Sequence, residues 1–278
     1  AGLDPTIMNG AVMKNFVALE APFASARVGA GAAFVSEVDE SDGSIALYAP
    51  TIAVLNNVSL DHKSLEELRQ LFGDFLARAQ TAVVNADDPE SMALVGHAKR
   101  VITFGLDPEA DISVEAGSIQ EGSTTISAKA IDRRSGEVCP LELRVPGRHN
   151  LANALAALAA TVAAGLPFAD AVQHVGGFAG LARRFDIVGT SPSGVTVIDD
   201  FGHNPEKVAA TLSTLKTHPG RVIAFFQPHG YGPLRQMGHE LAEVLASRLA
   251  PDDVTILCDP VYFGGTVDRS TGSERIAE

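Results

Sequence analysis

The sequence predicts an α/β protein of two domains, the second of them Rossmann-like. Three observations lead to this fold class. Up to residue 104, short apolar runs alternate with amphipathic helical patterns. The apolar residues then take a period of two between 111 and 145, and a second alternation of strands and helices begins at 195. The 278 residues suit two domains of ordinary size, and we place them at 1–185 and 186–278.

The first domain opens with apolar runs that are short enough to be buried strands of a sheet covered on both faces. Between these runs, Ser64 and Glu67 have the spacing of a capping box, in which the serine caps a helix. The helix that follows carries a continuous apolar stripe at a spacing of about 3.6 residues. Strands are expected at 33–38, 51–55, 81–85 and 101–104.

The period of two between 111 and 145 predicts an antiparallel ribbon, because its alternating stretches are separated by Gly-Ser and Arg-Ser-Gly turns. The last stretch stops at a Pro-Gly pair. An Ala- and Leu-rich helix runs from there to about residue 164, and Gly165 is placed to end it. A shorter helix follows at 168–175, and the glycine-rich segment 176–180 closes the domain.

The second domain has the pattern of a βαβαβ unit. Its first helix is marked by Asn204 as N-cap and by Pro205 at the first helical position. A second helical pattern ends near Leu249. Buried strands are expected at 195–200, 221–226 and 254–257. This alternation is typical of a Rossmann-like sheet.

Composition excludes several classes of partner. The net charge of −13 repels nucleic acid and anionic membranes. The lack of tryptophan, with 6% aromatic residues, disfavours a surface that stacks single-stranded bases. No apolar run reaches the roughly 18 residues that a membrane-spanning helix needs. Cys139 and Cys258 lack metal-binding spacing and are expected to be free thiols, so we expect a cytoplasmic globular protein.

Polar side chains follow three strands of the first domain, at the sheet edge where α/β proteins bind ligands. Glu37 begins a run of four carboxylates, whose oxygens suit Mg²⁺. His62 stands at a helix entrance, where a histidine can ligate a metal or orient phosphate. Asn85 and Asp88 follow the third strand and can contact a ribose or base. Each of these has a simpler interpretation. The run at Glu37 is then a solvated acidic loop, His62 a surface turn residue, and the segment of Asn85 and Asp88 a plain Asp-Asp-Pro turn.

The entrance to the Ala- and Leu-rich helix is the most informative stretch of the chain. His149, Asn150 and Asn153 lie at the mouth of an apolar helix, where polar side chains can hold a flat, hydrogen-bonding ligand such as a purine. In the alternative interpretation, Asn150 is only an N-cap and His149 a turn residue.

A further set of polar residues surrounds the proposed boundary and the strand ends of the second domain. The arginine pair at 183–184 stands at the boundary, where arginine forks match phosphate geometry, although a plain basic linker has the same composition. Polar groups at neighbouring strand ends are the expected form of a substrate site. The residues in these positions are Asp200, His203, His229 and Arg235.

Taken in order, these segments resemble the Mur ligase family, the ATP-dependent enzymes that build the peptide stem of peptidoglycan. Each motif is weak alone, but the ordered set is specific and covers essentially the whole chain. The motifs are Glu-x-Asp-Glu-Ser-Asp, Asn-x-x-x-Asp-His, Asn-x-Asp-Asp-Pro, Gly-Arg-His-Asn-x-x-Asn-Ala, Arg-Arg-Phe, Asp-Asp-x-Gly-His-x-Pro and Gln-Pro-His. The likeness is greatest to members that add L-alanine or a recycled tripeptide to UDP-N-acetylmuramate.

The resemblance implies a truncated P-loop-type central domain that binds ATP and carries the antiparallel ribbon, followed by an incomplete C-terminal ligase domain. In the implied reaction, ATP phosphorylates the carboxylate of a UDP-sugar acid. The amine of an amino acid or peptide then attacks the acyl phosphate, which releases phosphate and leaves an amide and ADP.

The resemblance also implies roles for the polar residues. Glu37, His62, Arg184 and His203 are the implied catalytic residues. Glu37 and His62 would bind Mg²⁺, and Arg184 would bind phosphate. Adenine would be contacted by His149, Asn150 and Asn153, with Asn85 and Asp88 near the nucleotide and Asp200 at the ribose or metal region. The acceptor would be contacted by His203, His229 and Arg235.

Three features depart from the family pattern. No Gly-x-x-x-x-Gly-Lys-[Ser/Thr] P-loop occurs, so we expect a fragment that lacks the P-loop strand and the UDP-binding domain, is cut at both ends and is inactive alone. Of the arginine-rich run after Gln-Pro-His in L-alanine-adding members, only Arg235 remains, which weakens a carboxylate clamp. No lysine matches the modified lysine of several members, because Lys63 directly follows His62.

The sequence therefore predicts part of an ADP-forming amide ligase of peptidoglycan precursor synthesis or recycling. Two alternatives stay open. One is a folylpolyglutamate-type ligase, against which the Gly-Arg-His-Asn and Asp-Asp-x-Gly-His sequences argue. The other is a non-catalytic nucleotide-binding module. The acceptor and the oligomeric state are not determined by the sequence.

Overall fold

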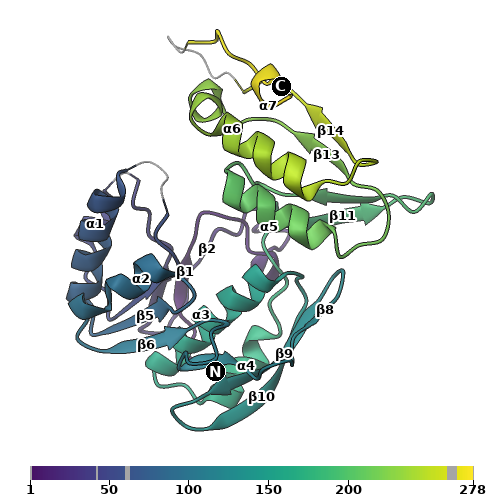
Figure 1. Cartoon of the computed structure of the whole chain (residues 1–278). Helices are drawn as coiled ribbons and strands as arrows, with labels where there is room; N and C mark the ends of the chain where they lie inside the picture. Colours follow the sequence, from purple (N-terminus) through teal and green to yellow (C-terminus); the bar gives the residue numbers. More distant parts are fainter. Residues whose placement is uncertain (1, 42, 60–62, 262–267, 278) are drawn as a thin grey trace. The chain divides into compact units, whose positions relative to one another are not determined.

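The computed structural model describes residues 2–41, 43–59, 63–261 and 268–277. The chain divides into two compact units, Ala1–Leu181 and Ala182–Glu278 (Figure 1). Both units combine sheets with helices, which confirms the predicted α/β class.

The first unit is built on a seven-stranded mixed sheet with the order β10-β9-β7-β6-β5-β4, in which β8 is added beside β9. The parallel half consists of β4 (Ile52–Leu55), β5 (Thr81–Asn85), β6 (Val101–Phe104) and β7 (Ile112–Val114). The antiparallel half, which is the predicted ribbon, consists of β8 (Gln120–Glu121), β9 (Ile126–Asp132) and β10 (Glu137–Leu143). Because β4, β5 and β6 are parallel, the loops that follow them leave from the same edge.

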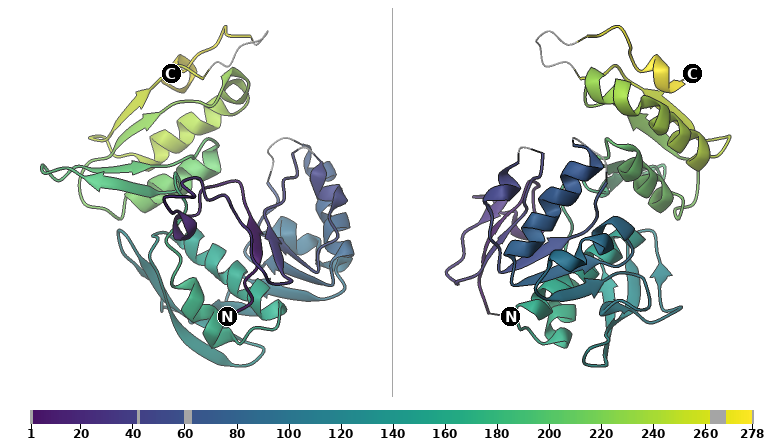
Figure 2. Two further views of the ribbon diagram at one scale, coloured as in Figure 1. Left: turned by 180° about the vertical axis from the view of Figure 1, so that it is seen from behind. Right: turned by 60° about the vertical axis from the view of Figure 1, so that its left-hand side comes forward.

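Helices cover both faces of this sheet, because apolar side chains on its central strands alternate between the two sides (Figures 1 and 2). On β5, Val83 belongs to one buried cluster, and Ala82 and Val84 belong to the other. The first cluster is covered by α3 (Arg148–Ala163) and α4 (Phe168–Val175), and the second by α1 (Leu65–Arg78). Shorter helical turns are η1 (Lys14–Phe16), η2 (Ser44–Leu47), α2 (Pro89–Ala93) and η3 (Val95–His97).

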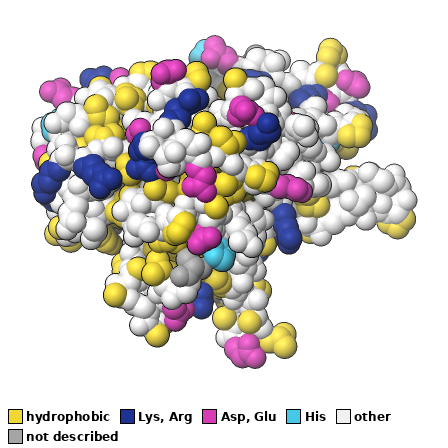
Figure 3. Space-filling model, turned by 90° about the horizontal axis from the view of Figure 1, so that it is seen from below, with side chains coloured by type: hydrophobic (Ala, Val, Ile, Leu, Met, Phe, Trp, Pro, Cys, Tyr) yellow, Lys and Arg dark blue, Asp and Glu magenta, His cyan; other side chains and the backbone are white. Residues whose placement is uncertain are grey.

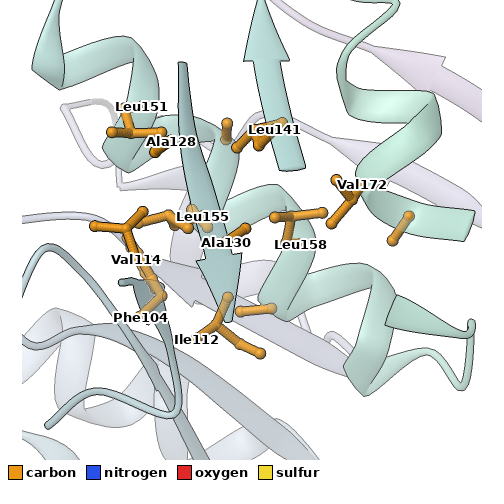
Figure 4. Close-up of a cluster of buried hydrophobic side chains, with 14 of the residues drawn as sticks. Phe104, Ile112, Val114, Ala128, Ala130, Leu141, Leu151, Leu155, Leu158 and Val172 are labelled. Atoms are coloured by element: carbon orange, nitrogen blue, oxygen red, sulfur yellow. The ribbon is translucent and has the colours of Figure 1, made fainter. Parts of the chain in front are cut away.

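The cluster beneath α3 fixes that helix to the sheet (Figure 4). Leu151, Leu155 and Leu158 lie at helical spacing on α3 and belong to the same cluster as Phe104 and Ile112 of the sheet. All five side chains are at most 1% exposed. Because truncating such a leucine to alanine costs about 2–5 kcal/mol, the polar residues at the start of α3 stand on a rigid support.

The ends of two helices confirm local predictions. At the start of α1, the Ser64 hydroxyl accepts the Glu67 N–H at 3.3 Å, and the Glu67 carboxylate accepts the Ser64 N–H at 3.0 Å. The Ser64 hydroxyl also donates to the Glu67 carboxylate at 2.6 Å, and this bond, together with the one from the Ser64 N–H, holds the pKa of Glu67 below its usual value. After α3, Gly165 has a φ of +89°, a left-handed conformation that favours glycine.

The first residues form a separate three-stranded sheet. In this sheet β1 (Thr6–Met8) pairs in antiparallel fashion with β2 (Ala26–Arg27) and in parallel with β3 (Phe34–Ser36). The expectation that 33–38 and 51–55 end at one sheet edge is wrong in this respect, because β3 takes its hydrogen bonds from β1 and no ladder joins it to β4 in the described part of the chain.

The second unit contains two small sheets. One pairs β11 (Asp186–Thr190) with β12 (Thr196–Asp199) in antiparallel fashion, and the other pairs β13 (Ile223–Phe226) with β14 (Val254–Leu257) in parallel. The helices are α5 (Pro205–Leu215), α6 (Tyr231–Arg248) and α7 (Glu274–Ala277). The succession β13-α6-β14 is the βαβ unit of a Rossmann-like domain. The predicted strand at 195–200 pairs with β11 and not with β13.

The helix starts of this unit follow the predicted signals. The Asn204 side chain accepts the Lys207 N–H at 2.9 Å, and Pro205 takes the first position of α5. The buried faces of α5 and α6 pack together through residues that include Leu212, Leu234 and Leu241.

The cysteines agree with the prediction of free thiols, and the surface carries charges of both signs (Figure 3). Acidic and basic side chains are interspersed among hydrophobic ones on the face shown in Figure 3. Cys139 and Cys258 are free and half-buried. Within the described ranges, no helix is both long enough and apolar enough to cross a membrane.

Candidate active site

The loops that follow β4 and β5 are joined by two of the predicted site residues. Asn85 Nδ2 donates to the Asn56 carbonyl oxygen at 2.8 Å. The Val58 N–H donates to Asp88 Oδ2 at 3.0 Å, and the same oxygen caps α2 by accepting the Ser91 N–H at 2.8 Å. Asn85 and Asp88 therefore give this edge of the sheet its shape. Their proposed contact with a nucleotide stays a prediction.

The loop that follows β6 is attached to the same edge by Asp87, which the sequence reasoning did not single out. Its two carboxylate oxygens accept the N–H groups of Leu106 and Asp107, both at 2.7 Å. A Cβ at Gly105 would lie 2.8 Å from Asp87 Oδ1, so glycine is required for this approach. Three consecutive loops of the parallel half are thus joined by side-chain hydrogen bonds.

Glu37 directly follows β3, and the loop after β1 holds its carboxylate. The Gly10 N–H donates to Glu37 Oε2 at 2.6 Å, and the Glu37 N–H donates to the Met8 carbonyl oxygen at 3.0 Å. A Cβ at Gly10 would lie 3.2 Å from Oε2, so the missing side chain allows the close approach. The bond occupies Oε2 and leaves Oε1 as a hard oxygen ligand of the kind that Mg²⁺ prefers.

His62, the second predicted metal ligand, lies outside the described residues. Its neighbour Lys63 is described, and Lys63 Nζ donates to the Ser41 carbonyl oxygen at 3.1 Å. Ser41 belongs to the acidic run that starts at Glu37, so the segment that enters α1 contacts the loop after β3. Among the described residues, no three His, Cys, Asp or Glu side chains gather as a metal site.

The first turns of α3 carry the polar residues of the purine-binding hypothesis. The N-cap is Gly147, with a φ of +95° and no side chain to cap the helix, so the alternative interpretation of Asn150 as N-cap is wrong. Asn150 Nδ2 donates to the Pro146 carbonyl oxygen at 2.6 Å, which leaves its amide oxygen for another partner. His149 and Asn153 are exposed.

This helix start lies beside the antiparallel half of the sheet. Arg148 Nε donates to Glu121 Oε1 on β8 at 2.6 Å. The three joined loops belong to the parallel half of the same sheet. The adenine-binding role proposed for this end of α3 stays a prediction.

In the second unit, four of the positively charged or titratable side chains surround one aromatic ring. We call this group the Phe201 cluster. Its members are Arg183, Arg184, Phe201, His203 and His229. The Cζ atoms of Arg183 and Arg184 lie 4.8 and 5.8 Å from the ring centroid. The rings of His203 and His229 lie 5.3 and 5.6 Å from it, in tilts of 66° and 75°.

Asp200 holds the backbone that presents this cluster. Its carboxylate accepts the N–H groups of Phe185 and Gly202, at 2.8 and 2.7 Å, and the Thr211 hydroxyl at 3.0 Å. Arg183 and Phe185 have φ values of +61° and +45°. Such left-handed residues cost about 1–3 kcal/mol each and concentrate at functional sites. Asp200 therefore organises the site internally, and its predicted contact with the ribose or metal region stays a prediction.

Arg235 has an internal partner. Its guanidinium donates to the Asp268 carbonyl oxygen at 2.7 Å and lies 3.6 Å from the Asp268 carboxylate. The pKa of Asp268 is lowered, first by hydrogen bonds from Ser270 and further by the Arg235 charge. The arginine predicted to face the acceptor is thus engaged by the segment that follows residue 267, and its contact with substrate stays a prediction.

Sequence reasoning missed Phe201, the residue that brings the cluster together. It is the unspecified position in Asp-Asp-x-Gly-His, and the usable signal was an aromatic residue between polar ones in a loop after a strand. It also missed Gly10, for which a glycine beside the turn residue Asn9 gave no sign of its distant partner Glu37.

Two family models match the chain. The model described as the Mur ligase middle domain matches residues 11–161, and the model described as the Mur ligase glutamate ligase domain matches residues 183–278.

Curated relatives of high similarity share one name. The chain is 34% identical to the UDP-N-acetylmuramate–L-alanine ligase of Pelobacter propionicus, over all of this chain and 60% of that protein. It is 36% identical to the ligase of the same name from Clavibacter michiganensis, over 98% of this chain and 55% of that protein. The chain therefore spans somewhat more than half the length of these relatives.

Solved structures show the same likeness. The UDP-N-acetylmuramate–alanine ligase of Thermotoga maritima matches with a TM-score of 0.74 and 26% identity, over 92% of this chain and 55% of that chain. Folylpolyglutamate synthetase from Lactobacillus casei matches with a TM-score of 0.59 and 19% identity, over 81% of this chain and 53% of that chain. At such low identity, the second match shows a shared fold alone.

Proposed function

This chain belongs to the Mur ligase family, and we propose that it supplies the nucleotide- and acceptor-binding parts of an ADP-forming amide ligase of peptidoglycan precursor synthesis or recycling. In the proposed reaction, ATP phosphorylates the carboxylate of a UDP-N-acetylmuramate donor. The amine of an amino acid or peptide then attacks the acyl carbon, which forms the amide bond and breaks the bond to phosphate. We assign the first unit, Ala1–Leu181, to ATP binding and the second unit, Ala182–Glu278, to the acceptor and the phosphoryl group.

The observation that carries the proposal is the set of joined loops at the parallel edge of the first unit. Phosphoryl transfer depends on positioning and on charge neutralisation, and both require groups that do not move. Asn85, Asp87 and Asp88 join the loops after β4, β5 and β6. Lys63 joins the acidic loop after β3 to the start of α1.

Glu37 fits a magnesium site. Its carboxylate is held through one oxygen by Gly10, and Mg²⁺ is usually held by one or two carboxylates, with waters and substrate phosphates as the other ligands. The proposed protein ligands are Glu37 and His62. When bound, Mg²⁺ neutralises charge on the phosphates. The role of Glu37 in this chain is to hold one oxygen in a fixed place.

The other contacts with ATP are assigned to the start of α3. The Asn150 amide keeps an oxygen acceptor, and His149 and Asn153 present polar groups on the exposed side of the same turns. Donors and acceptors on a rigid helix suit the hydrogen-bonding edge of adenine.

The second unit supplies positive charge for the acyl phosphate and contacts for the acceptor. Arg184 is assigned to the phosphoryl oxygens, because a planar guanidinium binds them through two parallel hydrogen bonds. His203 and His229 are assigned to the acceptor, with Arg235 as a further contact once it leaves Asp268. We also propose a cytoplasmic location, where ATP and UDP-linked precursors are available.

The experiment is acceptor-dependent phosphate release by the full-length protein that contains this chain. The assay supplies ATP, Mg²⁺ and UDP-N-acetylmuramate with L-alanine in one arm and the cell-wall tripeptide in another, and a folate with glutamate in a third. We expect equal amounts of ADP and phosphate in one of the first two arms, and no turnover by the isolated chain. Release in the folate arm alone, or in none, would overturn the assignment.

A further inference from the structure

The ring of Phe201 is the common contact of two guanidinium groups and two imidazoles that come from three separate segments of the second unit. The segments contribute Arg183 and Arg184 before β11, His203 after β12, and His229 after β13. The two histidine rings also lie 6.1 Å from each other.

The backbone fixes the ring in this place. The Phe201 N–H donates to the Arg183 carbonyl oxygen at 2.9 Å, so the ring and the arginine pair are joined through the main chain. Asp200 and Gly202, on either side of Phe201, are joined by a bond of 2.7 Å. Phe201 is therefore a fixed platform, to which longer and more flexible side chains attach.

The two arginines differ in their partners. Arg183 Nε lies 3.6 Å from Asp199 Oδ2, so its charge is partly compensated. Arg184 has no carboxylate within 4 Å among the described residues. A guanidinium that packs its face on an aromatic ring keeps its N–H groups in its own plane, where they can donate to an oxyanion.

We propose that Phe201 is a positioning residue, which orients the Arg184 guanidinium toward a phosphoryl oxyanion beside His203 and His229. This inference deepens the proposed function and rests on it for the identity of the anion. The shared chemistry of the ligand is an oxyanion, for which a phosphoryl group and the carboxylate of an acceptor are the two sources. Arg183, compensated by Asp199, fixes the loop and is not the anion ligand.

The test measures anion binding by the isolated chain, so it does not depend on ligase activity. Arginine Nε–H and histidine ring signals are followed by NMR during titration with inorganic phosphate and, in a second arm, with acetate. Wild type is compared with Phe201→Leu, which removes the aromatic ring, and with Phe201→Tyr, which keeps it. Phe225→Leu is the matched control, because Phe225 is 68% exposed on β13.

We expect phosphate to shift the Arg184 signal in wild type, in Phe201→Tyr and in Phe225→Leu with similar affinity. Phe201→Leu should bind phosphate about fivefold more weakly, the effect of one cation–π contact at an exposed site. Equal binding by Phe201→Leu, or no shift of Arg184 with phosphate, would overturn the proposal. A shift with acetate alone would overturn the phosphoryl assignment.

A second measurement separates positioning from folding. Arg184→Lys keeps the charge and lacks the planar fork, and we expect it to weaken phosphate binding as Phe201→Leu does while the far-UV circular dichroism of both stays that of wild type. If Phe201→Leu is unfolded, Arg184→Lys with unchanged phosphate affinity overturns the proposal. If the full-length protein has no ligase activity but wild type and the variants show the expected order of phosphate affinities, the proposed function is contradicted and the role of Phe201 stands.

Discussion

Two neighbouring aspartates at the end of β12 are expected to respond very differently to the same substitution. Asp200 accepts three hydrogen bonds, from Phe185, Gly202 and Thr211, at 2.7 to 3.0 Å. Asp199 has one ion pair, with Arg183 at 3.6 Å, and its side chain is 46% exposed. Changing each to asparagine keeps the shape and removes the charge.

The magnitude follows from what the new amide can still do. In Asp200→Asn the amide oxygen can keep two of the bonds, but an NH₂ group then faces a backbone N–H. Losing one charge-assisted bond and placing two donors together is expected to cost about 1.5–3 kcal/mol. Asp199→Asn loses only an exposed ion pair, which is expected to contribute about 0–1 kcal/mol.

The assay is amide hydrogen exchange at Phe185 and Gly202, the two N–H groups that Asp200 accepts. Because about 1.4 kcal/mol corresponds to a tenfold change in an equilibrium constant, Asp200→Asn should speed exchange at Phe185 by roughly ten- to hundredfold. Asp199→Asn should change it less than about fivefold. Equal effects of the two substitutions, or slow exchange in Asp200→Asn, would refute the view that Asp200 holds the left-handed backbone.

Two further outcomes are expected. Gly10→Ala places a Cβ 3.2 Å from Glu37 Oε2 and should weaken Mn²⁺ binding to the full-length protein about tenfold, as loss of a supporting contact does. The control Gly96→Ala, which has open space around its Cβ, should bind Mn²⁺ as the wild type does. Equal Mn²⁺ affinity of the two variants would contradict the role of Gly10. The pKa of Asp253 is lowered to about 2, first by the Lys216 side chain and then by backbone N–H groups. The stabilisation that the Asp253 carboxylate gives the fold is therefore complete above the usual carboxyl pKa and is lost as pH falls through about 2. The difference in melting temperature between wild type and Asp253→Asn should shrink across that pH range, and a constant difference would contradict this role of Asp253.

Local features of the fold could be predicted because neighbouring residues determine them. The capping box at Ser64 and Glu67 needs only a spacing of three, and the cap at Asn204 needs only the residues that follow it. Strand partners could not be predicted in the same way. The residues of β3 and β12 do not encode which neighbour will donate their hydrogen bonds, and each pairs outside the sheet in which it was expected.

The candidate site shows the same division. His203 and His229 were predicted as polar groups at strand ends and Arg184 as an arginine at the domain boundary, and the structure gathers the three around one ring. Phe201, whose ring these side chains contact, was missed because the search for site residues looked for polar side chains. The partner of Arg235 was missed because Asp268 lies 33 residues away.

The central claim is that the protein containing this chain activates a carboxylate as an acyl phosphate. The direct measurement uses UDP-N-acetylmuramate labelled with ¹⁸O in its carboxylate, together with ATP, Mg²⁺ and the acceptor. The account predicts that one ¹⁸O atom moves to the released phosphate and that ADP is the nucleotide product. Amide formation with unlabelled phosphate, or with AMP as the product, would contradict it.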